Sequence, residues 1–191
     1  CGGDSDSGDG AGILCSIPWG YLEEKINLKN TQEFNRGLGM VFMPNKKEKI
    51  EICKSICDEE AEKLKVNKTS WRTVPVNNEI LGPLAKANAP FICQWILYID
   101  KKDHKDVERL LFQLRKRIEK KIRETFKNDV GDCEFYFASL SSQTVVYKGM
   151  VRSEILSEFY QDLKEESFKV SFSVYHRRFS TNTLPKWPLA Q

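Results

Sequence analysis

The most informative run of this 191-residue chain reads His176-Arg177-Arg178-Phe179-Ser180-Thr181-Asn182-Thr183-Leu184-Pro185-Lys186-Trp187. It follows residues 170–176, whose alternation of apolar and polar side chains predicts a β-strand. The guanidinium of Arg178 can bind a carboxylate through two parallel hydrogen bonds, and Thr181 and Asn182 can donate or accept beside it. The run predicts a binding site for a small zwitterion at a strand end. By itself, it fits equally well a structural arginine that caps loop carbonyls.

The composition favours one globular domain over residues 1–191. Hydrophobic residues make up 40% and aromatic residues 11%, which is enough to build a core. The 30 basic and 27 acidic residues give a net charge of only +3, too balanced to indicate nucleic acid as a partner. Because no apolar run is long enough to span a bilayer and residues 1–12 do not resemble a secretory signal, we predict no membrane partner either.

The cysteines indicate a reducing, intracellular compartment. A secreted domain stapled by disulfides would be shorter and denser in cysteine, so we expect most thiols to be buried as small hydrophobes. His104 and His176 have no cysteine or carboxylate near them at metal-ligand spacing, and we predict no metal in this segment. The six cysteines are Cys1, Cys15, Cys53, Cys57, Cys93 and Cys133.

Hydrophobic periodicity predicts a layered α+β architecture with sheets covered by helices. Pro75 should end a strand or place it at a sheet edge. Two strands joined by a Ser-rich turn near Ser141 resemble a hairpin, which argues against a purely parallel sheet. The predicted strands are 13–17, 38–43, 71–76, 91–99, 134–140, 144–147 and 170–176, and the predicted helices are 18–26, 46–64, 103–126 and 152–160.

Two further patterns favour structural roles. The glycine-rich loop of residues 8–12 lacks the Lys-Ser/Thr of a phosphate-binding loop and precedes a strand, so we expect a tight turn with positive φ. The basic run Arg115-Lys116-Arg117 continues to Arg123 on one helix. Glu119 and Glu124 interrupt it and no aromatic platform is interleaved, so a solvated helix face is favoured.

Several stretches resemble the glutaminase domain of glutamate synthases, a class II glutamine amidotransferase. The first is R-F-S-T-N-T at 178–183, which a Pro and a Trp follow. Together the stretches lie in the family's order and cover nearly the whole chain. The others are G-D-G-A-G-I-L at 8–14, G-M-V-F at 39–42 before Pro44, W-R-x-V-P-V at 71–76 before L-G-P at 81–83, L-R-K-R-x-E at 114–119, and S-L-S-S-x-T-x-V-Y-K-G-M at 139–150.

The resemblance implies a fold and a site. The fold would be the N-terminal-nucleophile hydrolase-like four-layer αββα sandwich, in part. Arg178 would bind the α-carboxylate of glutamine, and Thr181 and Asn182 would line the same pocket. Arg177 departs from the family, where a small residue is usual, and adds a positive charge nearby. In the whole enzyme, ammonia from glutamine would react with 2-oxoglutarate at FMN, with electrons arriving through an iron–sulfur cluster. Neither cofactor is expected in this segment.

Cys1 invites comparison with the family's nucleophile, since an N-terminal cysteine can use its own α-amino group as a base. In the family, however, that cysteine stands in a C-G-V-G-F context some tens of residues before the G-D-G-A-G loop. Cys1 instead precedes Gly2-Gly3-Asp4, which matches the entry to that loop. The oxyanion-stabilising H-N-G-E segment would come after Gln191. The resemblance thus implies that 1–191 is a single domain, incomplete at both ends and inactive alone.

A second hypothesis is a non-catalytic relative of the same fold that binds a partner through the basic helix. The first hypothesis instead makes glutamine and the remaining synthase domains the partners. On either hypothesis, missing strands would leave sheet edges unpaired. We therefore expect marginal stability or self-association.

Overall fold

The structure is a computed structural model that describes residues 10–26, 34–100, 103–127, 134–177 and 186–189. Short 3₁₀ turns cover Asn78–Ile80, Ser153–Ile155, Gln161–Lys164 and Trp187–Leu189. The helices and strands are β1 (Ala11–Ser16), α1 (Trp19–Ile26), β2 (Phe34–Met43), α2 (Lys47–Lys63), β3 (Lys68–Thr73), α3 (Pro83–Ala87), β4 (Phe91–Asp100), α4 (His104–Thr125), β5 (Tyr136–Ser141), β6 (Thr144–Gly149), α5 (Leu156–Phe159) and β7 (Ser173–His176).

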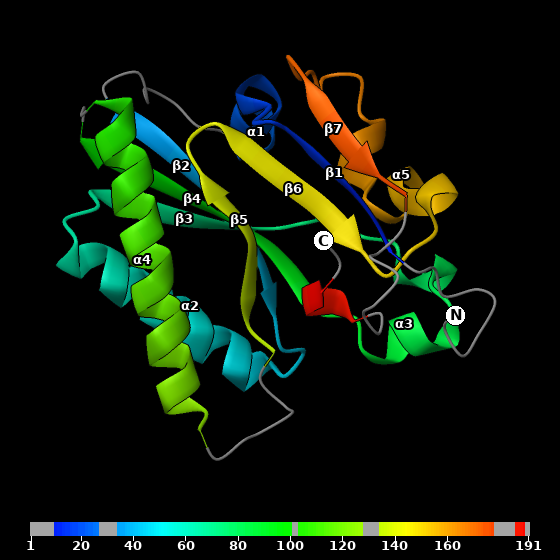
Figure 1. Ribbon diagram of the computed structural model, residues 1–191, viewed down its shortest axis with the longest axis horizontal. Coiled ribbons are helices and arrows are strands. Elements are labelled where there is room, and N and C mark those ends of the chain that lie inside the picture. Colours follow the sequence, from blue (N-terminus) through cyan, green and yellow to red (C-terminus); the bar gives the residue numbers. More distant parts are fainter. Residues whose placement is uncertain (1–9, 27–33, 101–102, 128–133, 178–185, 190–191) are drawn as a thin grey trace.

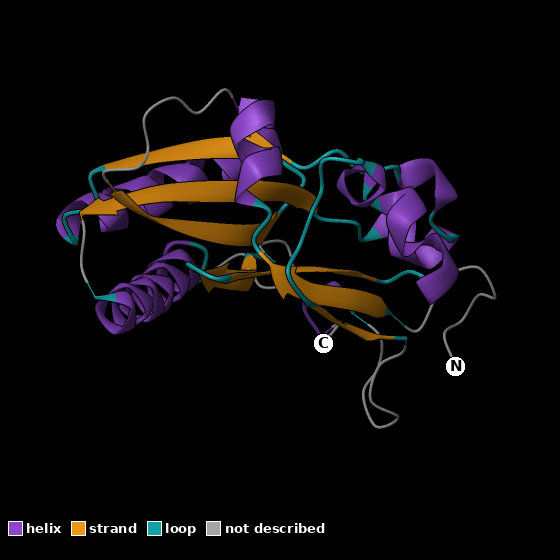
Figure 2. Ribbon diagram, turned by 90° about the horizontal axis from the view of Figure 1, so that it is seen from above, coloured by secondary structure: helices purple, strands orange, loops and turns teal. Residues whose placement is uncertain are grey.

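In the described part of the chain the strands form two antiparallel sheets. One has the strand order β6-β1-β7 and the other β3-β4-β2-β5. The long helices α2 and α4 lie on one side of the molecule, and the short helix α5 lies on the opposite side (Figures 1 and 2). The expected α+β class and the two-sheet arrangement of an N-terminal-nucleophile hydrolase are confirmed. β3 is an edge strand that ends before Pro75, as predicted.

Strand β4 is buried on both faces because it divides two apolar cores of the described residues. Ile92 and Ile96 point into the inter-sheet core, which also contains side chains from β1, β2 and β6. Trp95 and Leu97 point the other way, into the sheet–helix core formed with α2 and α4. A strand covered on both sides reads as a continuous apolar run, which is what residues 91–99 predict.

The periodicity of α2 and α4 decides which face of each helix is buried. Their buried residues recur at spacings of three and four, as an amphipathic helix requires. Each fully buried Leu or Ile stabilises the fold by roughly 1.5–3 kcal/mol relative to exposure. The predicted ranges 46–64 and 103–126 are confirmed to within about a residue at each end. The buried apolar side chains are Ile50, Cys53, Ile56, Cys57 and Ala61 of α2 and Val107, Leu111, Leu114, Ile118 and Ile122 of α4.

The hairpin expected around Ser141 is wrong, because β5 and β6 belong to different sheets. β5 pairs with β2 and β6 pairs with β1. The turn between them carries the chain from one sheet to the other, and Glu108 of α4 holds it, accepting from the backbone N–H of Ser142 at 2.7 Å. The inference that the sheets are not purely parallel is confirmed, since every strand pairing among the described residues is antiparallel.

Two elements near the end of the described chain are shorter than predicted. The helix expected over 152–160 divides into a 3₁₀ turn and α5, and α5 ends at Phe159 because Tyr160 is extended and bridges Val76. β7 begins at Ser173, not at residue 170. Just before it, the backbone N–H of Ser171 is bound by the Ser16 hydroxyl at 2.8 Å.

A buried polar network joins the two sheets through Asp162. Its carboxylate is fully buried and receives two hydrogen bonds from Arg72 of β3, at 2.7 and 2.8 Å. Tyr21 of α1 donates to it at 2.7 Å and Tyr147 of β6 at 3.0 Å. Gln94 of β4 closes the network between Arg72 and Tyr147. A buried charge is tolerated only when it is paired and hydrogen-bonded, as here.

The substitution Asp162→Asn should lower the free energy of unfolding by about 3 kcal/mol, because it leaves the Arg72 guanidinium buried without its counter-ion. Urea denaturation measures the change as a shift in midpoint. The exposed ion pair of Lys86 and Glu79 is the control, and Glu79→Gln should change stability by less than about 0.5 kcal/mol. Equal midpoints for the two variants would contradict the role given to Asp162.

Candidate functional site

The predicted binding residues Arg178, Thr181 and Asn182 lie within 178–185, outside the described residues. Cys1 also lies outside the described residues. The site is therefore built here from its described neighbours. His176, the last residue of β7, stands just before the segment, and Trp187 stands just after it. These two residues lie on either side of the predicted run, within the part of the chain that the structure describes.

His176 lies at one end of the three-stranded sheet. Ala11, the first residue of β1, pairs with Gly149, the last of β6. Gly12 pairs with His176, the last of β7. The arrowheads of β6 and β7 accordingly point toward the same end of the sheet (Figure 1). Gly12 of β1 and His176, the last residue of β7, thus lie side by side at this end of the sheet.

Glycines permit close contacts at this end. Gly10 has a φ of 111°, so the positive φ expected in the glycine-rich loop is confirmed at this residue, while residues 8 and 9 lie outside the described part of the chain. At Gly12, a Cβ would lie 2.5 Å from Nε2 of His176 and 2.9 Å from Cβ of Lys148. Position 12 therefore has no room for a larger residue while His176 and Lys148 keep their places.

Trp187 fixes the far end of the segment. Its ring is buried, at 2% exposure, between Phe42 of β2 and Phe159 of α5, and its Nε1 donates to the carbonyl of Ala85 at 3.1 Å. A Cβ at Gly149 would stand 2.8 Å from this ring. Both ends of the predicted run are thus attached to β6 or its neighbour β1.

Lys148 is a buried cation beside these glycines. Its side chain is 2% exposed, and its ammonium lies 4.4 Å from the centroid of the Tyr136 ring. Burial, with a smaller contribution from the positive charge of Arg115, lowers the pKa of Lys148 to about 8. Nothing in the sequence motif of residues 139–150 indicates that the charge of Lys148 is buried.

Arg177 follows the last residue of β7 directly. It is exposed, and its Nη2 lies 3.4 Å from the carboxylate of Glu154. The extra positive charge expected from the sequence is thus paired at the surface.

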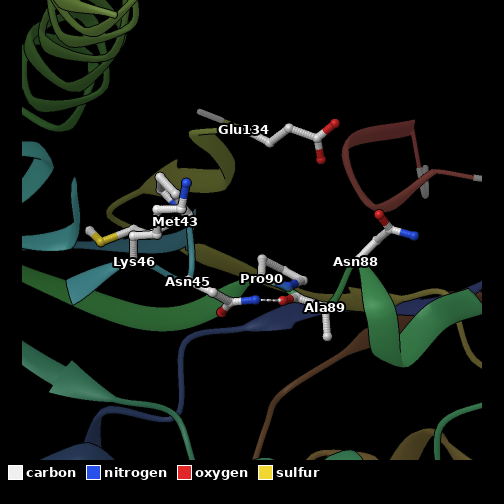
Figure 3. A pocket seen from close by; sticks show the side chains of 8 residues that line it. Met43, Asn45, Lys46, Asn88, Ala89, Pro90 and Glu134 are labelled. Carbon is white, nitrogen blue, oxygen red and sulfur yellow. Dashed lines mark hydrogen bonds between the residues drawn. The ribbon is translucent and has the colours of Figure 1, made fainter. Parts of the chain in front are cut away.

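An open pocket of about 210 Å³ lies where β2 ends and β4 begins (Figure 3). Asn45 on its floor donates to the carbonyl of Ala89. Asn88, Lys46 and Glu134 add an amide and both signs of charge to the rim. No pattern in the sequence predicts a functional role for these side chains. The lining residues are Met43, Pro44, Asn45, Lys46, Asn88, Ala89, Pro90 and Glu134.

The described cysteines behave as buried hydrophobes, as predicted. Cys15, Cys53, Cys57 and Cys93 are buried and free. Burial raises the pKa of Cys15 and of Cys93 to about 11, and it raises the pKa of Cys57 above its usual value. Thiols with raised pKa values are poor nucleophiles at neutral pH, because the thiolate is the reactive form.

The described ranges contain no cluster of three or more His, Cys, Asp or Glu side chains able to hold a metal ion. Among those same residues, no helix is both long and apolar enough to cross a membrane.

The comparisons with known proteins agree with one another on the kind of protein that this chain resembles. A family model described as class II glutamine amidotransferases matches residues 1–191. The chain is 44% identical to a chloroplastic ferredoxin-dependent glutamate synthase of Oryza sativa subsp. japonica and 44% identical to ferredoxin-dependent glutamate synthase 2 of Synechocystis sp.. It is 42% identical to ferredoxin-dependent glutamate synthase 1 of Arabidopsis thaliana. Each alignment covers 100% of this chain and 12% of the relative, so the chain spans about an eighth of their length.

The substitution Gly149→Ala should displace the Trp187 ring, because the new methyl would lie 2.8 Å from it. Overpacking of this kind costs typically about 1–3 kcal/mol. Urea unfolding together with tryptophan fluorescence would measure both the loss and the displacement. The matched control is Gly20→Ala in α1, where a Cβ meets nothing within 4 Å. The control should stabilise the fold by about 0.5–1 kcal/mol, and destabilisation of both variants alike would refute the contact.

The substitution Lys148→Met should stabilise the fold at pH 7 by about 1–2 kcal/mol, since burying the charge costs more than the Tyr136 ring returns. The pKa of Lys148 falls from 10.5 to about 8 on folding. Between these values the unfolded chain binds more protons, so this residue's contribution to wild-type stability rises with pH. The advantage of the methionine variant should therefore be full below pH 8 and shrink toward pH 10. Urea midpoints at pH 7 and 9.5 measure it, and a difference that does not change with pH would be contrary to this account.

Proposed function

Because this chain belongs to the class II glutamine amidotransferases, we propose that it is a segment of the glutaminase domain of a glutamate synthase. In this proposal the domain hydrolyses glutamine to glutamate and ammonia. The ammonia then serves the reductive formation of glutamate from 2-oxoglutarate elsewhere in the protein. The observation that carries the proposal is the family match over residues 1–191, together with relatives named as glutamate synthases.

The glutamine site is assigned to the run between His176 and Trp187. Arg178 binds the α-carboxylate, because a guanidinium pairs with a carboxylate through two parallel bonds. Thr181 and Asn182 complete the pocket as neutral donors and acceptors. The described contacts of His176 with Gly12 and of Trp187 with Gly149 support this assignment, since they hold the chain at both ends of the run.

The catalytic groups are assigned outside residues 1–191. The cysteine nucleophile is proposed upstream of the glycine-rich loop, and the oxyanion donors after Gln191. Residues 1–191 then form part of one domain and leave the remaining synthase domains as its partners. The described cysteines are buried in apolar cores, and among the described residues no three ligand-type side chains are grouped to hold a metal, which does not fit an iron–sulfur cluster. The cluster and the FMN are accordingly assigned to the rest of the protein.

The electron donor and the cellular location are inferred from the same relatives. Their names suggest ferredoxin as the electron donor and an organelle as the location in plants. Free buried thiols suit a reducing intracellular compartment,. We propose that the protein that carries the chain lies in a reducing intracellular compartment and uses ferredoxin as its electron donor.

Replacing Arg178 by Ala in the protein with its complete glutaminase domain should lower kcat/KM for glutamine about 30- to 150-fold. This corresponds to about 2–3 kcal/mol, the usual strength of a charge-assisted bidentate contact. The loss should appear chiefly in KM, since the carboxylate does not change during hydrolysis. Ammonia release at several glutamine concentrations gives both constants.

The neighbouring Arg177 provides the control. It is exposed and paired with Glu154, so Arg177→Ala should change kcat/KM by less than about twofold. If Arg178→Ala were equally silent, the carboxylate would have to be bound by another residue and the assignment would fail.

A further inference from the structure

The open pocket at the end of β2 lies between two turns that are joined to each other. One turn connects β2 to α2 and contains Asn45, and the other connects α3 to β4 and contains Asn88. Met43 pairs with Phe91 in the four-stranded sheet, and the Asn45 side chain donates to the carbonyl of Ala89. Because both walls are attached to the same sheet, the pocket is formed before any ligand arrives, as is usual for small-molecule sites.

The pocket has an apolar lining and a polar rim. Apolar contacts supply affinity in such sites, and a few polar groups fix the orientation of the ligand. The polar groups here stand at exposed positions, whereas three of the four apolar residues are buried. The apolar lining consists of Met43, Pro44, Ala89 and Pro90, and the polar side chains are those of Asn45, Lys46, Asn88 and Glu134.

The rim carries a carboxylate and an ammonium group. Figure 3 shows Lys46 and Asn88 on opposite sides of the pocket, with the Glu134 carboxylate turned toward Asn88. The Nδ2 of Asn88 donates to the carbonyl of Leu84 at 3.0 Å, so its Oδ1 is the amide atom that can accept from a ligand. A ligand ammonium therefore suits the side of Glu134 and Asn88, and a ligand carboxylate suits the side of Lys46.

The volume of the pocket limits the ligand to one small molecule. At about 210 Å³, it is smaller than the roughly 300–1,000 Å³ of sites for drug-sized ligands. A nucleotide or a peptide of several residues would be too large, whereas a single amino acid with a short side chain has a suitable size. Glutamine suits the pocket poorly, because its side-chain amide would lie against the apolar lining without a hydrogen-bond partner.

From this arrangement we infer that the open pocket binds a free α-amino acid with a short apolar side chain. Its α-ammonium group lies between the Glu134 carboxylate and the Oδ1 of Asn88, and the long side chain of Lys46 reaches its α-carboxylate. The apolar side chain of the ligand contacts Pro90 and its apolar neighbours. This amino acid is bound apart from the glutamine that is assigned to Arg178.

The position of the charges sets the expected strength. Lys46 and Glu134 stand at exposed positions, where solvent screens an ion pair and each pair contributes little. For a ligand of about eight non-hydrogen atoms, such as valine, a Kd of about 0.1–1 mM is expected.

Saturation-transfer difference NMR on the protein that carries this chain tests the inference, with L-valine as the probe. L-Valine should bind with a Kd of about 0.1–1 mM. Isovalerate lacks its ammonium group and isobutylamine lacks its carboxylate, so each should bind at least about fivefold more weakly. Glu134→Gln and Lys46→Met should each raise the Kd for L-valine at least about fivefold for the same reason.

Two matched controls separate the pocket from a general effect of charge. Lys47 is the exposed neighbour of Lys46, and Glu79 is an exposed acid, and neither lines the pocket. Lys47→Met and Glu79→Gln should therefore change the Kd for L-valine by less than about twofold.

Arg178→Ala separates the pocket from the glutamine site, because L-valine should bind this variant as it binds wild type. Loss of L-valine binding in Arg178→Ala, with binding retained in Glu134→Gln, would place the amino acid in the glutamine site and overturn the inference. Absence of saturable binding up to about 10 mM, ten times the weakest expected Kd, would also overturn it. Binding is measured without turnover, so these outcomes do not depend on whether the protein hydrolyses glutamine.

Discussion

The buried carboxylate of Asp162 is the constraint on which the arrangement of the two sheets depends. It follows β6 in sequence, yet its strongest partner is Arg72 at the edge of the other sheet. Tyr21 and Tyr147 bring α1 and β6 to the same point. Since an unpaired charge could not remain in this core, the sheets cannot shift relative to each other without breaking the network.

The sequence predicts well those elements whose burial has a period. The apolar spacing of α4 and the continuous apolar run of β4 each identify one element, because neighbouring residues suffice to show which face is covered. The sequence around Ser141 predicts a hairpin, and the prediction is wrong because a short polar turn has the same sequence pattern within a sheet and between two sheets. The choice depends on which strand each arm pairs with, and those partners, β2 and β1, lie far away in the chain.

The candidate site likewise has features that the sequence predicts and features that it does not. A compact run of chemically suited residues around Arg178 could be recognised from the sequence alone. The contacts of Gly149 with Trp187 and of Gly12 with His176 could not, because each joins residues distant in sequence. The burial of Lys148 likewise depends on Tyr136 of a strand in the other sheet. Its sequence neighbours show only an alternating strand, in which a lysine would be expected to face solvent.

Because β4 lines both apolar cores, unfolding of one core affects the other. Trp95 lies in the sheet–helix core, Trp187 lies in the inter-sheet core, and β4 lines both. Removing either layer would strip one face of β4 and leave the other core with a wall open to water. Neither core can therefore be lost while the other stays intact, and the sheet and its two coverings form one cooperative unit.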